Sequence, residues 1–369
     1  MSLCHRANAS ATVFKQGIFK LSENKQIPAT DAYWASFWEL PESSDDVFSL
    51  FSPSDIRRIR DDSLRNLETL ILAVTSRLYQ LRHNPDFPNW DNAPERHALN
   101  CIRVLTRLLP YIYEAEYLED WEDEFFWSTR RRLIKKEKTN HGDMVVDEPT
   151  AEEDNHTTQE HKPEDYEDVK PLGEELIDTL VDLLFFNDFT ILRTEADKPK
   201  VSYSIWQSGV GCNTAVGSSQ DIESRRMEIL RLLLTLSSKS MYTPANILPV
   251  QGIKAITYLT TLEEKQIVLT LLCSLLNTAL KYNPATWRVP YDHMVFKDTK
   301  QVFVTYCLQL LLVLVLYPVP DPANGIPPKN SFRHFLGKLH RPQDFQFLVD
   351  GMTRILNQPV STIEKKHVT

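Results

Sequence analysis

Apolar residues recur every three to four positions along much of the chain, which is the spacing of one face of an α-helix. One such stripe covers four helical turns and consists of Leu67, Leu70, Ile71, Val74, Leu78 and Leu81. A second stripe begins after Asp91-Asn92-Ala93-Pro94 and has Arg103, Arg107 and Glu114 on its outer side. Its inner positions are Ala98, Ile102, Leu105, Leu109 and Ile112. Two antiparallel amphipathic helices are therefore predicted, which together form the basic unit of a helical solenoid.

Local signals refine this first helical region. Pro110 lies inside the second stripe and predicts a kink or a break, because proline removes a backbone donor. Ser52-Pro53-Ser54-Asp55 is a typical helix start, with Ser52 as the cap and Pro53 in the first turn. An aromatic packing face is predicted from Tyr33, Trp34, Phe37 and Trp38.

The second half of the chain repeats the helical spacing without a fixed period. Helices are predicted over 172–186, 222–236, 263–281 and 300–316, with shorter ones over 331–339 and 342–356. Alternating residues at 189–191 and 201–205 predict a small hairpin. We therefore expect an all-α protein, an irregular HEAT- or armadillo-like solenoid interrupted by a disordered acidic insertion.

Changes in composition divide the chain. Residues 143–168 carry eleven carboxylates and one lysine, too polar a composition to recover the entropy of ordering by burial. The predicted parts are a weakly patterned segment (1–32), a first helical region (33–138), an acidic disordered linker (139–170), a second helical region (171–360) and a tail (361–369). The basic run at 130–138 before the linker permits a docking segment, although a solvated tract is favoured.

Composition also restricts the class of protein. Only 10 glycines in 369 residues favour helices over sheets. A net charge of −9 argues against a nucleic-acid partner, because binding to phosphates needs a basic face. The five dispersed cysteines lack metal or redox spacing, and we expect reduced thiols. The apolar run 302–316 is interpreted as a buried core helix, with a membrane span as the alternative that resistance to alkaline extraction would support.

No segment carries an established catalytic or cofactor motif. Ser208-Gly209-Val210-Gly211 lacks the third glycine and the context of a dinucleotide fingerprint. His334 and His340 lack metal-pair spacing, and a structural hydrogen bond is favoured for His293. The histidines of the acidic stretch, His141, His156 and His161, are expected to be solvated rather than to bind metal.

The carboxylates of one short segment are the remaining candidates for chemistry. Asp120, Glu122, Asp123 and Glu124 lie beside Trp121 and are interpreted as solvated surface. Paired carboxylates leave an acid–base interpretation open. We predict no catalytic, cofactor-binding or metal-ligating residue, no cofactor and no small-molecule substrate. A regulatory partner of an enzyme, or a cryptic hydrolase that uses these carboxylates or His293, is the alternative.

Several blocks together resemble one family. They are 100–114 (NCIRVLTRLLPYIYE), 125–127, 182–190 (DLLFFNDFT), 205–206 with 209–211, 275–278, 282–284, 289–293, 344–347 and 354–357. In this order, from about Phe14 to Val360, the chain resembles the high-temperature-induced dauer-formation proteins, relatives of dymeclin, and fungal members in particular. The resemblance implies helical-repeat proteins that associate peripherally with the cytoplasmic face of Golgi membranes and help to sort secretory cargo. It implies partners among trafficking proteins and gives no catalytic residue.

Two departures from the family pattern affect these expectations. Family members begin Met-Gly, a myristoylation signal, whereas Ser2 follows Met1 here, so the chain as written is not expected to carry the lipid. A misassigned first exon or an unanchored isoform would account for this start. Cys4 is a weak candidate for palmitoylation, and an ordinary thiol is favoured. Family proteins also run longer, so we expect an N-terminal portion that is marginally stable or aggregation-prone, with Ile355 and Leu356 near an uncapped end.

Overall fold

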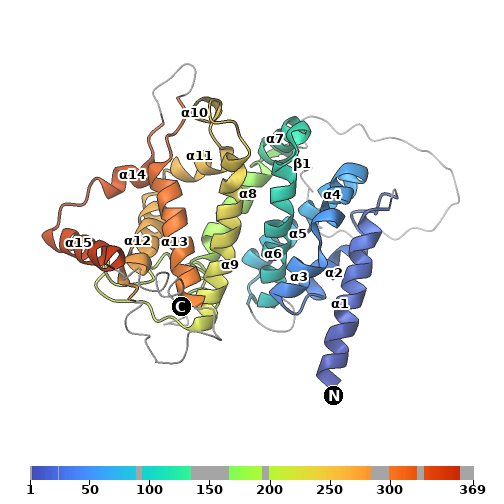
Figure 1. Cartoon of the computed structure of the whole chain (residues 1–369), viewed down its shortest axis with the longest axis horizontal. Helices are drawn as coiled ribbons and strands as arrows, with labels where there is room; N and C mark the ends of the chain where they lie inside the picture. Colours follow the sequence, from blue (N-terminus) through green and yellow to red (C-terminus); the bar gives the residue numbers. More distant parts are fainter. Residues whose placement is uncertain are drawn as a thin grey trace, which may run out of the picture.

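The computed structural model describes residues 2–23, 25–88, 94–133, 166–192, 199–283, 299–321 and 328–357, and these are mostly helical. The helices are α1 (Ser2–Leu21), α2 (Ser36–Glu39), α3 (Ser44–Leu50), α4 (Pro53–Asp62), α5 (Leu64–His83), α6 (Glu95–Tyr113), α7 (Glu119–Trp127), α8 (Leu172–Leu183), α9 (Gln220–Ser237), α10 (Leu248–Gln251), α11 (Lys254–Thr260), α12 (Lys265–Lys281), α13 (Thr299–Leu316), α14 (Ser331–Leu336) and α15 (Pro342–Leu356). Short 3₁₀ helices are η1 (Ala32–Ala35), η2 (Glu116–Leu118) and η4 (Ser238–Met241). The chain progresses along the long axis, from α1 at one end to α15 at the other (Figure 1).

Consecutive long helices pack as pairs, and the pairs lie side by side. The pairs are α5 with α6, α8 with α9, and α12 with α13, while α6, α9 and α13 form one row (Figure 1). One hydrophobic core runs through all of them. The all-α class is confirmed. The pairs differ in helix length and in their connections, and the solenoid remains a prediction.

The two helical stripes expected at the start of this array are confirmed. Every predicted inner residue of α5 and α6 is buried. Pro110 does not break α6, which continues to Tyr113. The ring only removes the donor that would meet the carbonyl of Thr106, four residues earlier. The predicted cap is also present, since the Ser52 side chain accepts from the Asp55 backbone N–H at 3.3 Å.

The N-terminal segment contains more structure than its sequence indicated. Phe14, Ile18 and Leu21 lie four and three residues apart on α1, and all three side chains are buried. This face packs against α2, α3 and α4. The predicted aromatic face meets it, since the Phe14 and Phe37 rings lie 5.7 Å apart.

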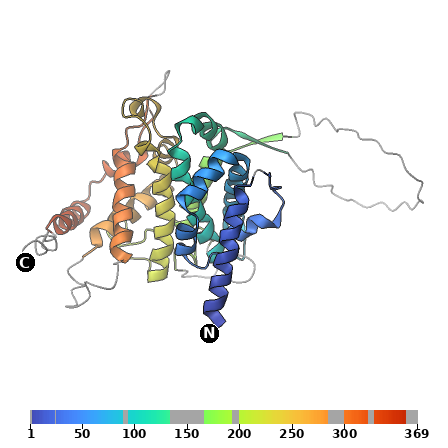
Figure 2. The ribbon, with the colours of Figure 1, turned by 45° about the vertical axis from the view of Figure 1, so that its right-hand side comes forward.

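A two-stranded antiparallel ribbon projects from the helices. It pairs β1 (Arg130–Leu133) with β2 (Tyr166–Val169), with Arg131 opposite Asp168 (Figure 2). Residues 139–165 of the predicted acidic linker lie outside the described residues, but its last part, 166–169, is this second strand. The acidic composition concealed the strand.

The hairpin predicted at 189–191 and 201–205 is not formed. Only isolated bridges join Phe186 to Val201 and Asn187 to Ile191. Asp188 has a positive φ of 65°, which turns the chain sharply. The Thr190 hydroxyl then donates to the Leu183 carbonyl at 2.6 Å and accepts from the Phe186 N–H at 3.0 Å. Side-chain bonds thus replace the expected strand ladder.

Helix α13 contains the apolar run 302–316. Its length and composition would allow a membrane crossing, and it is the single helix with that property among the described residues. In the structure it packs against α9 and α12. Phe303, Cys307, Leu310 and Leu314 on its inner side are buried. Cys101 and Cys273 are likewise buried and, like Cys307, free thiols.

Candidate functional site

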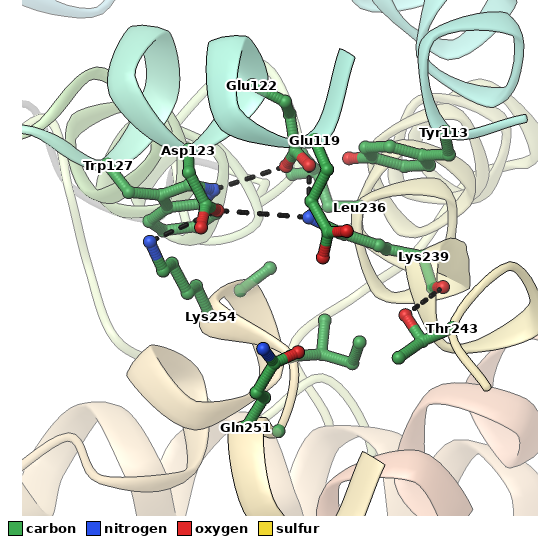
Figure 3. Close-up of a pocket in the computed structure, with 13 residues that line it drawn as sticks. Tyr113, Glu119, Glu122, Asp123, Trp127, Leu236, Lys239, Thr243, Gln251 and Lys254 are labelled. Atoms are coloured by element: carbon green, nitrogen blue, oxygen red, sulfur yellow. Dashed lines mark hydrogen bonds and ion pairs between the residues drawn. The ribbon is translucent and has the colours of Figure 1, made fainter. Parts of the chain in front are cut away.

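A groove lies where α6 and α9 end, between α7 on one side and η4 with the α10 region on the other. It consists of two adjoining cavities of about 170 and 210 Å³. The residues shared by both cavities are Tyr113, Glu119, Glu122, Lys239, Thr243 and Gln251. Figure 3 shows side chains from all these elements pointing into the first cavity.

Helix α7 is fixed on the molecule by its aromatic residues. Phe126 is buried, and the rings of Trp121 and Phe125 stack 5.0 Å apart. The Trp121 indole N–H also donates to a Glu68 carboxylate oxygen on α5 at 2.6 Å. Glu122 precedes Phe126 by four residues, so both side chains lie on the face of α7 that points inward.

The charged cluster of α7 is divided between two environments. The interpretation as solvated surface fits Asp120 and Glu124, which are exposed. It is wrong for Glu122, which is 4% exposed. The Lys239 ammonium on η4 donates to the Glu122 carboxylate, and the Trp127 indole N–H donates to it at 3.4 Å. The buried charge is therefore paired.

Asp123 extends this pairing into a small network (Figure 3). One of its carboxylate oxygens lies 3.1 Å from the Lys254 ammonium of α11 and 3.8 Å from that of Lys239. Two lysines therefore neutralise two carboxylates, and they join α7 to η4 and α11. Because Glu122 is buried and Lys239 is mostly buried, this contact ties the two groove walls together.

Burial raises the pKa of Glu122, and the neighbouring Lys239 charge opposes that rise only in part. Burial also raises the pKa of Tyr113 well above its usual range, with a further contribution from the Glu122 charge. The Tyr113 hydroxyl points towards Glu122 (Figure 3). A carboxyl with a raised pKa is a feature of acid–base sites, although structural ion pairs produce it as well.

The lining does not supply the other parts of a hydrolytic site. No histidine, cysteine or serine lines either cavity within the described part of the chain. Each cavity is smaller than the roughly 300–1,000 Å³ of ordinary small-molecule sites. The volumes fit single side chains of a partner better than a cofactor or a metabolite.

The second cavity combines an apolar end with free carboxylates. Its apolar lining residues are Ile112, Ala115, Leu118, Tyr242, Pro244 and Ile247. Glu116 and Glu119 line the same cavity and are exposed to solvent. Neither has an ion-pair partner among the described residues. No sequence motif marks either residue.

The glycine pair of the sequence analysis serves packing. The Val210 N–H donates to the buried Asn277 side-chain oxygen at 2.9 Å, and the Asn277 amide donates to the Gln207 and Val210 carbonyls. A Cβ at Gly209 would lie 2.7 Å from that same oxygen. The loop backbone therefore binds a core asparagine, and Gly209 lies directly against it.

The other candidate residues do not come together. His334 contacts Lys329, and His340 lies against the Lys338 carbonyl. His141, His156, His161 and His293 lie outside the described residues. Over the described ranges no cluster of three or more potential metal ligands occurs. Ser2 and Cys4 belong to α1, but the structure describes only their backbone.

Comparisons with known proteins agree on one family. The family model described as high-temperature-induced dauer-formation protein matches residues 6–369. The "Ubp5-interacting protein ftp105" of Schizosaccharomyces pombe is 31% identical over 415 residues, which cover 96% of the chain and 44% of that relative. "Protein HID1" of Mus musculus and that of Homo sapiens are each 31% identical over 377 residues, covering 94% of the chain and 44% of the relative. The chain thus spans less than half the length of these curated relatives. None of these names denotes an enzyme, and no solved structure matches the chain.

Proposed function

Because this chain belongs to the high-temperature-induced dauer-formation protein family, we propose that it is a scaffold or adaptor that binds other proteins at the cytoplasmic face of Golgi membranes. There it takes part in sorting secretory cargo. Recognition of partner segments by surfaces between helices is its mechanism, and no bond is made or broken.

The observation that carries the proposal is the family match over 6–369. A relative that aligns with nearly the whole chain is named for its interaction with another protein, Ubp5. That name supports protein binding as the general activity. The groove beside α7 adds a local reason, because its two cavities have the size of side chains and lie at the surface.

Localisation of the tagged protein in living cells tests the proposal. The chain that begins Met1-Ser2 is compared with a Ser2→Gly variant, whose start satisfies the glycine requirement of N-myristoylation. Golgi signal for both forms supports recruitment by protein contacts. Golgi signal for the Ser2→Gly form alone supports the family role with the lipid as anchor. Diffuse signal for both forms contradicts the Golgi scaffold.

A further inference from the structure

The groove beside α7 has an uneven distribution of charge that identifies what it can accept. Four carboxylates line it, those of Glu116, Glu119, Glu122 and Asp123, against two ammonium groups, those of Lys239 and Lys254. Both lysines are already paired, as described above. The charge left available to a partner is therefore the negative charge of Glu116 and Glu119. These residues are three positions apart in consecutive helical turns, so one cation can approach both.

The helix ends around the groove do not reverse this preference. Helices α6 and α9 end beside it, at Tyr113 and Ser237, and the carbonyl end of a helix carries partial negative charge. The N-terminus of α7 lies there too, and its partial positive charge is offset by the three carboxylates of its own first turn. A phosphate or a nucleic acid would meet unfavourable potential here. A guanidinium or an ammonium group would be attracted, and exposed carboxylates at the rim cost little to desolvate in part.

Immediately beside these carboxylates the same cavity is apolar. Leu118 and Ile112 are almost fully buried and form its inner wall, while Tyr242 is 41% exposed at its edge. A cavity of about 210 Å³ can hold one large apolar side chain. Apolar pockets with a polar rim are where the anchor residues of protein partners bind.

We propose that this groove is the docking site for a segment of a partner protein that carries an arginine or lysine beside one large apolar residue. The inference rests on the proposed function as a protein-binding scaffold and specifies the chemistry of one partner. The apolar side chain enters the cavity lined by Ile112 and Leu118. The cationic group binds Glu116 and Glu119, and arginine is preferred because its planar donors can contact two carboxylates. The Glu122–Lys239 pair ties the walls together and stays intact.

Selection of peptides on the purified chain tests this directly. A phage-displayed library of random dodecapeptides is selected on the wild-type chain, and single enriched peptides are then measured by fluorescence polarisation. We expect enriched sequences to place an arginine or lysine within a few residues of a large apolar residue. The Glu116→Lys/Glu119→Lys variant should weaken their binding by roughly tenfold or more, because the attraction becomes repulsion.

A matched control is available on α7, the helix that begins at Glu119. Asp120 and Glu124 are exposed and line neither cavity. The Asp120→Lys/Glu124→Lys variant changes the net charge equally and should leave affinity unchanged. Circular dichroism confirms that both variants keep the helical fold. Enriched peptides without a basic residue, peptides that bind the two variants equally, or no enrichment at all would overturn the proposal. If Golgi localisation were intact, such a result would contradict the docking site in the groove but not the proposed scaffold function.

Discussion

Lys239, on η4 directly after α9, donates to the buried carboxylate of Glu122 on α7, a residue 117 positions away in the sequence. Glu122 is 4% exposed, so the contact replaces most of the water that its carboxylate loses on folding. Removal of Lys239 leaves the buried Glu122 carboxylate without a compensating charge, whereas removal of the Glu122 charge leaves the more exposed Lys239 beside Asp123. The two residues are therefore predicted to respond differently to mutation.

Lys239→Met should lower the free energy of unfolding by about 3 kcal/mol near neutral pH, because Glu122 remains buried as a lone carboxylate. Glu122→Gln keeps a hydrogen-bonding group near Trp127 and should cost only about 1 kcal/mol. Urea unfolding followed by circular dichroism measures both.

The pKa of Glu122 is raised in the fold, so its contribution to stability is present below its ordinary pKa of 4.5 and is lost as pH rises through the raised value. The deficit of Lys239→Met should therefore shrink in acid. Equal losses for the two variants would show that the pair does not hold the walls.

His97 should make the fold sensitive to mild acid. Burial, together with the charges of Arg77 and Arg96, lowers its pKa from 6.5 to about 4. The ring nitrogen Nδ1 lies 3.1 Å from an Arg77 guanidinium nitrogen, a contact suited to the neutral ring. In the unfolded chain the His97 ring takes up a proton below about pH 6.5, whereas in the folded chain it does so only near pH 4. The free energy of unfolding therefore falls as the pH drops from 6.5 to 4. The urea midpoint should drop less between these values in His97→Gln than in wild type. His340→Gln, at an exposed histidine, is the control, and an unchanged drop in His97→Gln contradicts the assignment.

Gly209→Ala should destabilise the chain by about 2 kcal/mol or more, because a Cβ there would meet the Asn277 side chain and φ is 152°. Gly17→Ala is the matched comparison. Gly17 lies within α1, and a Cβ there would have its nearest neighbour at 3.7 Å. That substitution should stabilise by about 0.5–1 kcal/mol, since alanine favours helix. Thermal unfolding ranks the two variants, and a stable Gly209→Ala protein would mean that the loop does not depend on Asn277.

Helix α15 should promote self-association at high concentration. It exposes an apolar stripe of Phe345, Val349, Met352 and Leu356, whose side chains are 50–79% exposed. Stripes of this kind on a helix surface favour association. Val349→Lys/Met352→Lys should lower the aggregated fraction measured by light scattering. Gln346→Lys/Thr353→Lys adds the same charge to polar positions of the same helix and should lower it less. Equal effects would assign the association to net charge alone.

Local patterns were sufficient for the long helices but not for the site. The stripes of α5 and α6 could be predicted because helical spacing is a property of neighbouring residues. The burial of Glu122 could not be predicted, because it depends on Lys239, which only the fold brings near. Its position four residues before Phe126 was the available signal. Gly209 similarly owes its role to Asn277, a partner distant in the sequence. Strand β2 was missed because pairing with β1 outweighs its acidic composition.

Secretion in cells whose own gene carries the groove substitutions tests the central claim most directly. The quantity measured is the fraction of a secreted reporter that reaches the medium. Glu116→Lys/Glu119→Lys should lower it while the level and Golgi localisation of the protein stay unchanged, and Asp120→Lys/Glu124→Lys should match wild type. Full secretion with the groove variant would contradict the claim that this chain acts in cargo sorting through the groove.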